Sequence, residues 1–319
     1  MAYSIVNSFI GAGLLATTIA LGATTAQAAE AASCKNVRFS DVGWTDITAT
    51  TAATSVVLKA LGYAPKATVL SVPVTYASLK NGDIDVFLGN WMPTMEGDIK
   101  KYREDGSVET IAKNLTGAKY TLAVNKAAAD GGVKHFADIT EYKDKFEGKI
   151  YGIEPGNDGN RLIQGMIDKG TFGLDGFTVV ESSEQGMLAQ VKRAERRKEW
   201  VVFLGWEPHP MNANFNLTYL AGGDDVFGPN FGGAEVFTNV RKGYVTECPN
   251  VGKLLTNQTF TLAMENEIMG AILDDGKDPE KAATAWLKGH SDVLGKWLVG
   301  VTTFDGKDGM AAVKAGLGL

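Results

Sequence analysis

The chain has 319 residues, of which 45% are apolar and 21% are charged, and its formal net charge is −6. This length is more than one hydrophobic core usually serves, so we expect two domains or lobes. The composition excludes a disordered or repetitive chain, and the net acidity argues against nucleic acid as a partner. The one basic run, at 192–198, mixes charges of both signs on a predicted helix and indicates a solvated face.

Residues 1–28 have the pattern of a secretory signal peptide. An apolar stretch precedes the small-residue site Ala26-Gln27-Ala28, so the mature chain would begin at Ala29. The segment contains no Lys or Arg, although a signal peptide normally carries one near its start. A membrane anchor is the alternative, but the apolar run is short for a span of about 20 residues and is interrupted by Gly and Thr. We therefore expect cleavage and export.

Two cysteines, Cys34 and Cys248, lie outside the predicted signal peptide. In an exported protein such a pair suggests a disulfide, whereas in the cytosol both would be free thiols. The bond would tie the start of the mature chain to a segment about two thirds of the way along it. We therefore expect one lobe to contain both cysteines.

From residue 36 onward, short apolar runs alternate with helical stretches. This alternation predicts largely parallel, doubly wound α/β sheets with helices on both faces. In a first block, strands are expected over 36–44, 66–73 and 84–91, and helices over 45–63 and 74–83. In a second block, strands are expected over 120–126, 177–182 and 199–206, a strand and Gly-rich turn over 148–161, and helices over 161–170 and 183–198.

The segment after about residue 211 has too few strands for a third lobe, and it contains Cys248. We therefore predict that lobe one comprises 29–113 plus 213–319 and that lobe two comprises 114–212. Two segments, near 113–118 and 208–214, would cross between the lobes and form a hinge. Ligands of such α/β proteins bind in the crevice beside the carboxyl ends of the strands.

Three of the predicted strands end with a Gly followed closely by a Trp. The sequences are SDVGW (40–44), VFLGNW (86–91) and VFLGW (202–206). Trp is more often a core residue than a ligand wall, but the shared position favours a wall at these three strand ends. In our division Trp44 and Trp91 belong to lobe one and Trp206 to lobe two, so closure of the lobes would bring the three indoles together. The remaining tryptophans have no such position, and Trp286 and Trp297 are expected to pack on helices.

A pocket with aromatic walls suits a quaternary ammonium group, which has no N–H to donate. Each ring face attracts such a cation by roughly 0.5 to 2 kcal/mol. Three or four faces therefore supply at most about 8 kcal/mol, which is what micromolar affinity requires. An anion would supplement them, and Asp46 is the nearest candidate, although Asp is also a common helix N-cap.

Five segments resemble the periplasmic substrate-binding proteins of glycine betaine/choline ABC transporters, and the rhizobial choline-binding type in particular. The segments are DVGWTD (41–46), GNWMPTM (89–95), GAKYTLAV (117–124), GIEPGND (152–158) and VFLGWEPHPMN (202–212). The resemblance implies an α/β fold of the type II periplasmic binding proteins, with two doubly wound lobes joined by two crossover segments around a central cleft. It also implies a monomer in the periplasm that passes its ligand to an ABC permease, is not an enzyme, and needs no cofactor or metal.

Position by position, the resemblance implies an aromatic box around the trimethylammonium group of choline. Asp46 would supply charge and, together with Asn157, would bind the choline hydroxyl. Acetylcholine is a further possible ligand. The four residues of the implied box are Trp44, Trp91, Tyr120 and Trp206.

Other ligands and one other class of function stay open. Glycine betaine binders often have a His where this chain has Met95, so choline is favoured over glycine betaine, carnitine or another methylammonium compound. His209 keeps the betaine alternative open. A remote alternative is a choline-ester or sugar hydrolase that pairs Asp46 with Glu154 or Glu207. The chain has neither a G-x-S-x-G motif nor clustered histidines.

The turn at 152–159 contains two further acidic residues, Glu154 and Asp158. We interpret both as turn and surface groups. The glycines of this turn do not have the spacing of a dinucleotide-binding motif, so no nucleotide cofactor is expected.

Overall fold

A computed structural model describes residues 1–4 and 29–319. The signal-peptide prediction for 1–28 rests on residues that lie outside this described part. Among the described residues, no helix is both long and apolar enough to cross a membrane.

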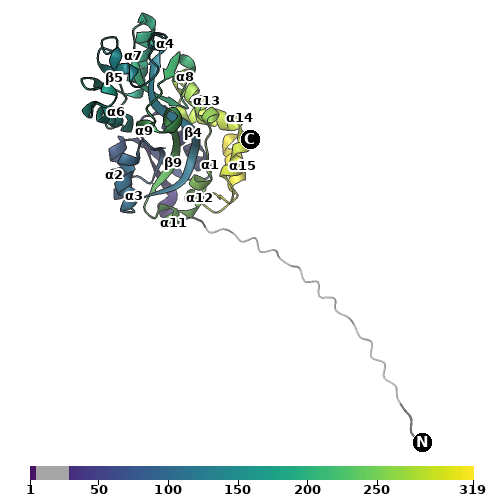
Figure 1. Ribbon diagram of the computed structural model, residues 1–319. Coiled ribbons are helices and arrows are strands. Elements are labelled where there is room, and N and C mark those ends of the chain that lie inside the picture. The colour runs from purple at the N-terminus through teal and green to yellow at the C-terminus, as the bar shows by residue number, and fades with distance from the viewer. Residues whose placement is uncertain (5–28) are drawn as a thin grey trace.

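In the described residues, nine strands form one continuous mixed sheet, and helices pack on both of its faces (Figure 1). The strands follow the order β2-β1-β3-β9-β4-β7-β5-β6, with β8 beside β4. Figure 1 shows a lower and an upper globular part, and β4 runs from one into the other. The strands are β1 (Asn36–Asp41), β2 (Ala64–Val69), β3 (Val86–Met92), β4 (Val108–Asn125), β5 (Lys149–Tyr151), β6 (Thr178–Val180), β7 (Val202–Glu207), β8 (Leu217–Tyr219) and β9 (Gly233–Arg241).

The two ends of the sheet have the predicted parallel pairing, but its centre does not. β1 pairs in parallel with β2 and β3, and β5 pairs in parallel with β6 and β7. Between these ends, β4 and β9 are antiparallel to their neighbours. The prediction of largely parallel sheets is therefore wrong for the centre of the molecule. Only the apolar end of β4 was expected as a strand, because the segment before it is too polar to indicate one.

β4 contains 18 residues and pairs with different strands along its length. Its first part pairs with β9 and its last part with β7 and β8. The first predicted crossover, at 113–118, lies inside this strand, and the β4–β9 ladder shifts register three times between Thr110 and Ala118. β8 pairs with Ala123–Asn125 of β4. A strand of the predicted lobe one therefore lies next to a segment of the predicted lobe two.

The helices of the first block occur where the sequence predicts them, on either side of β2. The C-terminal helices pack against the first of these, α1, and complete the lower part (Figure 1). The principal helices are α1 (Thr45–Ala60), α2 (Val72–Asn81), α3 (Glu96–Glu104), α6 (Asp158–Asp168), α7 (Glu184–Arg197), α12 (Pro249–Asn257), α13 (Leu262–Leu273), α14 (Pro279–Gly289) and α16 (Gly309–Leu317). Shorter helical segments are η1 (Ala32–Lys35), α4 (Lys126–Asp130), α5 (Asp138–Glu141), η2 (Thr171–Gly173), α8 (Met211–Asn214), α9 (Asp224–Phe227), α10 (Pro229–Gly232), α11 (Tyr244–Glu247), η3 (Ser291–Val293) and α15 (Leu294–Trp297).

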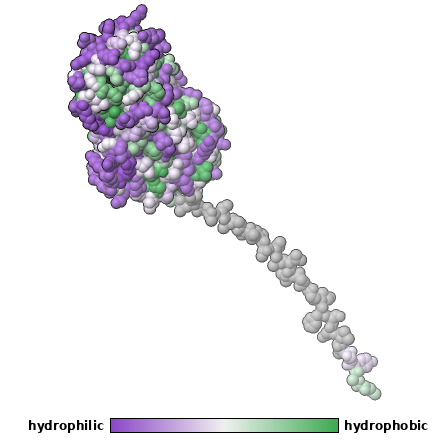
Figure 2. All heavy atoms as spheres, viewed as in Figure 1, coloured by the Kyte–Doolittle hydropathy of each residue, from purple (hydrophilic) through white to green (hydrophobic). Residues whose placement is uncertain are grey.

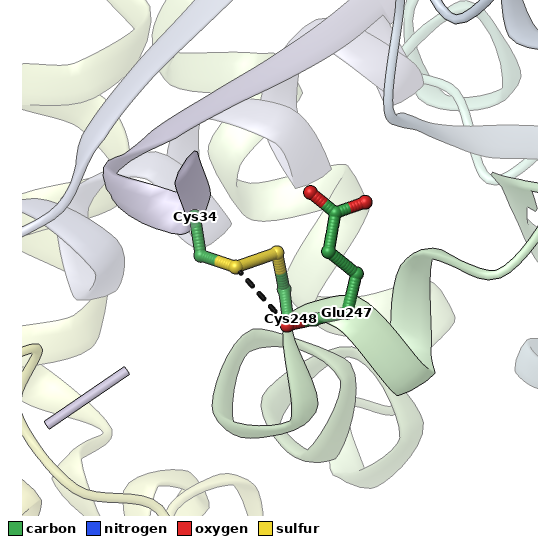
Figure 3. Close-up of side chains that lie close together, drawn as sticks. All are labelled: Cys34, Glu247 and Cys248. Atoms are coloured by element: carbon green, nitrogen blue, oxygen red, sulfur yellow. Dashed lines mark hydrogen bonds between the residues drawn. A yellow bond between two sulfur atoms is a disulfide. The ribbon is translucent and has the colours of Figure 1, made fainter. Parts of the chain in front are cut away.

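A disulfide joins Cys34 to Cys248, as predicted, and both residues are buried (Figure 3). It connects η1 to the segment that follows α11, with the two Cα atoms 5.5 Å apart. Glu247 lies beside the bond, and its backbone carbonyl oxygen is 3.4 Å from the Cys34 sulfur. Because both sulfurs are in the disulfide, this cluster cannot offer thiolates to a metal ion.

Hydrophilic residues dominate the face of the molecule shown in Figure 2, with small apolar patches between them. The body narrows between its upper and lower parts. Most large apolar side chains are instead in one continuous core. Trp297 is fully buried in this core, as predicted, whereas Trp286 is only partly buried and stacks on His290.

Candidate ligand-binding site

One cavity brings together all six residues that the sequence analysis selected. It lies where β3, β4 and β7 meet the first turns of α1 and α6. Its lining residues are Trp44, Asp46, Trp91, Tyr120, Ile153, Asn157, Asp158 and Trp206. Each of the eight is at most 5% exposed, so the cavity is closed off from bulk solvent.

The aromatic walls come from neighbouring strands of the sheet. Tyr120 of β4 and Trp206 of β7 are direct partners in the antiparallel ladder, so their side chains share one face. Their ring centroids are 6.2 Å apart with the planes at 81°, and the Trp91 ring lies 6.1 Å from that of Tyr120 at 62°. Three of the aromatic rings therefore meet at angles and do not stack on one another.

The positions of the three tryptophans in the Gly-Trp pattern differ slightly from the predicted positions just after the strands. Trp91 and Trp206 lie inside β3 and β7, each of which continues one residue further, and do not follow the strands. Trp44 follows β1 by three residues, through a turn in which Gly43 has φ +83°, and it is the N-cap residue of α1. Gly can adopt this left-handed conformation at little cost. The turn thus directs Trp44 toward the other walls.

Asp46 lies in the first turn of α1, and its two carboxylate oxygens have different surroundings. Oδ2 accepts a hydrogen bond of 3.1 Å from Trp91 Nε1. Oδ1 is buried and has no hydrogen-bond partner among the described residues. Burial, reinforced by the charge of Glu184, raises the pKa of Asp46 to about 8. An unpartnered buried carboxylate is costly, and a cation in the cavity would offset that cost.

Asn157 caps α6 and also holds Tyr120 in place. Its Oδ1 accepts hydrogen bonds from the Asn160 backbone N–H at 3.1 Å and from the Tyr120 hydroxyl at 2.9 Å. Its Nδ2 donates to Asp158 Oδ1 at 3.2 Å. The amide oxygen and one of the two amide N–H groups are therefore used within the protein, which leaves one N–H, and the position of the amide determines where the Tyr120 ring lies.

Asp158 is not a surface group, so that interpretation is wrong for this residue, whereas Glu154 is only partly buried. Asp158 is fully buried and lines the cavity, and its Oδ2 lacks a partner within the described part of the chain. Burial raises the pKa of Asp158 to about 6. Glu154 accepts a hydrogen bond of 2.8 Å from Trp44 Nε1, and burial raises its pKa to about 7. Pro155 and Gly156 of the turn are exposed, whereas Glu154 and Asp158 lie beside residues distant in sequence, so local pattern gives little signal for their positions.

His209 and Met95, the two residues relevant to a betaine carboxylate, both lie outside the cavity lining. His209 is buried, with its Nδ1 accepting from the Met211 backbone N–H at 2.9 Å and its Nε2 3.3 Å from Glu184 Oε1. Met95 is buried, and its sulfur accepts from the Trp91 backbone N–H at 3.2 Å. Neither side chain offers a hydrogen-bond donor to the enclosed space.

Comparisons with known proteins all indicate the same family. A solved ABC-transporter choline binding protein in complex with choline is 70% identical, with 90% of this chain and 100% of that chain covered and a TM-score of 0.90. An ABC-transporter choline binding protein in an unliganded semi-closed conformation is 71% identical over the same shares, with a TM-score of 0.83.

A more distant relative points to the same family of transport proteins. The glycine betaine/carnitine transport binding protein GbuC of Listeria monocytogenes serotype 1/2a (strain 10403S) is 31% identical over 159 residues, which are 50% of this chain and 52% of that protein. The family model for the substrate binding domain of the ABC-type glycine betaine transport system matches residues 35–289. This chain therefore belongs to the family of substrate-binding domains of ABC-type glycine betaine transport systems.

Proposed function

We propose that this protein captures choline in the aromatic cavity and delivers it to the permease of an ABC importer. One observation carries the proposal: four aromatic rings line a cavity together with Asp46, whose Oδ1 is buried and has no hydrogen-bond partner among the described residues. The chain also superposes better on the relative in complex with choline than on the unliganded one, with TM-scores of 0.90 and 0.83.

The four rings would hold the trimethylammonium group. Ring faces supply roughly 0.5 to 2 kcal/mol each, and exclusion of water from the closed cavity favours the upper part of that range. The charge of Asp46 adds to this attraction. The choline hydroxyl would be bound by Asp46 and Asn157, and Asp158 Oδ2, which has no partner in the described part of the chain, would be a further acceptor for it.

Glycine betaine and carnitine are the second candidates, because the related GbuC is a glycine betaine/carnitine transport binding protein. Both ligands carry a carboxylate, which would share the cavity with Asp46 and Asp158. A ligand carboxylate repels an ionised aspartate in the same cavity, and burial strengthens the repulsion. We therefore favour choline, and acetylcholine as a larger ligand with the same cationic group.

We further propose the division into lobes given above, with a closing cleft between 29–113 plus 213–319 and 114–212. The mature protein would begin at Ala29 and act in the periplasm as a monomer. Closure around the ligand would be stabilised only by contacts that involve both lobes, since a ligand shifts a conformational equilibrium by its differential affinity for the two states.

Calorimetry and tryptophan fluorescence with choline, acetylcholine and glycine betaine test the proposal. We expect saturable binding of choline at micromolar concentration. The variant Asp46→Ala should weaken choline binding much more than betaine binding, because both ligands lose the attraction between Asp46 and their ammonium group, whereas betaine also loses the repulsion between Asp46 and its own carboxylate. Asp144→Ala, which removes an exposed carboxylate, is the matched control.

Two results would contradict this assignment. If the three ligands all failed to give a saturable signal, the function would be wrong. Equal losses for choline and betaine in Asp46→Ala would indicate that Asp46 has a structural role only. Release of acetic acid from acetylcholine over hours at high protein concentration would instead favour the hydrolase alternative.

A further inference from the structure

The N-terminus of α1 is capped by a residue from a distant part of the chain. Its own N-cap, Trp44, makes no side-chain capping hydrogen bond to the described residues. Glu184, the first residue of α7, supplies the cap instead. Its Oε2 accepts from the Thr45 backbone N–H at 2.8 Å, and its Oε1 accepts from Thr45 Oγ1 at 2.5 Å. A carboxylate here satisfies an orphan N–H and also interacts favourably with the helix dipole.

His209 supports Glu184 from the opposite side. Because the Met211 backbone N–H donates to its Nδ1, a neutral imidazole carries its hydrogen on Nε2, which faces Glu184 Oε1 at 3.3 Å. The same imidazole lies edge-on to Trp206, with ring centroids 4.9 Å apart. A chain of contacts thus runs from one cavity wall, Trp206, through His209 and Glu184 to Thr45, which is flanked by the cavity residues Trp44 and Asp46.

We propose that Glu184 is a latch residue that sets how long the cavity stays closed, and that it acts through Thr45 without touching the ligand. The inference rests on the proposed function and on the proposed lobes, since Thr45 belongs to lobe one and Glu184 to lobe two. Opening of the cleft would separate Glu184 from both of its Thr45 donors. The contact therefore exists only in the closed state, as a latch requires.

Burial distinguishes this contact from the polar contact that Arg161 makes between the same lobes. Arg161 donates to Asp98 Oδ2 at 2.7 Å and to the Thr94 carbonyl oxygen at 3.0 Å, but its side chain is 43% exposed. The side chain of Glu184 is 0% exposed. A solvated ion pair contributes little, whereas hydrogen bonds to a buried charge contribute more. Glu184 is thus a stronger determinant of closure than Arg161.

Removal of a latch has a different expected effect on ligand release from removal of a residue that contacts the ligand. The cavity lining includes none of Thr45, Glu184 and His209. Loss of the latch should therefore raise koff by the same factor for choline and acetylcholine, which carry the same cationic group, and leave the selectivity between them unchanged. In Glu184→Gln, an amide N–H₂ replaces one acceptor oxygen and faces a donor of Thr45, so the variant breaks the contact at nearly constant volume.

Stopped-flow tryptophan fluorescence on the full mature protein tests the latch with choline and acetylcholine. In Glu184→Gln we expect koff to rise about tenfold for both ligands, while kon stays within about twofold. Thr45→Val should behave in the same way, and Thr45→Ser, which keeps the hydroxyl, should restore nearly the original koff. Glu195→Gln makes the same change of charge on the partly exposed side of α7 and should leave koff unaltered.

Combining Glu184→Gln with Thr45→Val should raise koff no more than the more severe single variant, because both remove one contact. An unchanged koff in Glu184→Gln, a multiplicative effect in the double variant, or unequal factors for the two ligands would overturn the proposal. A lower fraction of active protein with unchanged koff would indicate a role in folding only, which would also overturn it.

Small-angle scattering of the ligand-free protein gives a readout that does not depend on choline. Glu184→Gln and Thr45→Val should have larger radii of gyration than the unsubstituted protein and the Glu195→Gln control. If the protein bound no choline, the proposed function would fail, and the scattering would decide the latch separately. Identical scattering of all four proteins would then overturn it.

Discussion

At the scale of single residues, Asp46 combines a structural contact with a free acceptor. One oxygen holds the indole N–H of Trp91 and so fixes one cavity wall, while the other is buried without a partner in the described structure. The pKa of Asp46 is raised to about 8, so near neutral pH the empty site favours the protonated carboxyl. A cation in the cavity favours the carboxylate, and binding must then release a proton.

We therefore predict that choline binding weakens as the pH falls below about 8. Below this pKa each binding event must first ionise Asp46, so Kd should rise by up to about tenfold per pH unit. The direction of this pH dependence follows from the raised pKa, since a carboxyl with a lowered pKa would be ionised at every pH from 6 to 9 and would cause no change in Kd. Calorimetry at pH 6 to 9 in buffers with different ionisation enthalpies measures both the affinity and the proton release.

Asp46→Asn is the control for this pH dependence. It should bind choline weakly and should lose most of the proton release, although Glu154 and Asp158, whose pKa values are about 7 and about 6, leave a smaller part at lower pH. A choline affinity that stayed constant from pH 6 to 9 in the unsubstituted protein would contradict the prediction.

At the scale of elements, the site depends on how closely α6 approaches β4. Gly159, in the first turn of α6, lies directly against the Tyr120 ring. A Cβ atom at this position would be 2.1 Å from the Tyr120 hydroxyl oxygen and 2.9 Å from a methyl group of Leu204. The helix can therefore hold Asn157 within hydrogen-bond distance of Tyr120 only because this residue has no side chain.

Gly159→Ala should displace the Tyr120 ring and weaken choline binding at least tenfold, as the loss of one well-placed wall and its hydrogen bond would. Gly165→Ala lies in the same helix, where an added Cβ meets nothing within 4 Å, and should leave binding unchanged and stability equal or slightly higher. Titration of both variants, with thermal unfolding to confirm folding, measures the difference. Equal affinities for the two variants would show that the Tyr120 ring is not a wall of the functional site.

The same elements explain how much of the site can be predicted from sequence. Trp44, Trp91 and Trp206 could be selected because a strand pattern repeats around them, and a strand pattern is local. Tyr120 was selected only through the family resemblance, since its position opposite Trp206 depends on the antiparallel β4–β7 pairing. The parallel pairing at the two ends of the sheet was likewise predictable, whereas its antiparallel centre was not.

The residues that sequence analysis misjudged all depend on long-range packing. Asp158 has the sequence context of an ordinary turn residue, but it begins α6 and lines the cavity together with the aromatic rings. His209 looks like a candidate ligand donor, but its hydrogen bonds go to Met211 and Glu184. Glu184 is 139 residues from its partner Thr45, and no local pattern relates them.

At the scale of the whole molecule, the disulfide closes a loop of 214 residues that includes the cavity residues. On the chain-entropy argument, such a bond stabilises the folded state by up to about 5 kcal/mol, an upper bound because residual structure in the unfolded chain reduces it. We predict that the double variant Cys34→Ser with Cys248→Ser has a clearly lower Tm than the oxidised protein. Its choline affinity should be unchanged, because neither residue lines the cavity.

Differential scanning calorimetry of the oxidised protein, the reduced protein and the double variant measures this effect. The reduced protein and the double variant should unfold at similar temperatures. A Tm equal to that of the oxidised protein in both cases would show that the bond adds no stability. A loss of affinity at a temperature where the variant is folded would show that the disulfide also shapes the site.

The three register shifts between β4 and β9 have a consequence for how this protein can diverge. They lie between Thr110 and Ala118, in a stretch that contains none of the cavity residues. Irregular pairing interrupts the ladder, so the sheet bends there more easily than elsewhere. Substitutions in this stretch would change the stiffness of the sheet, and hence the speed of ligand exchange, while the choice of ligand stayed the same. On the proposed motion of the lobes, the rate of ligand exchange and the choice of ligand thus depend on different residues.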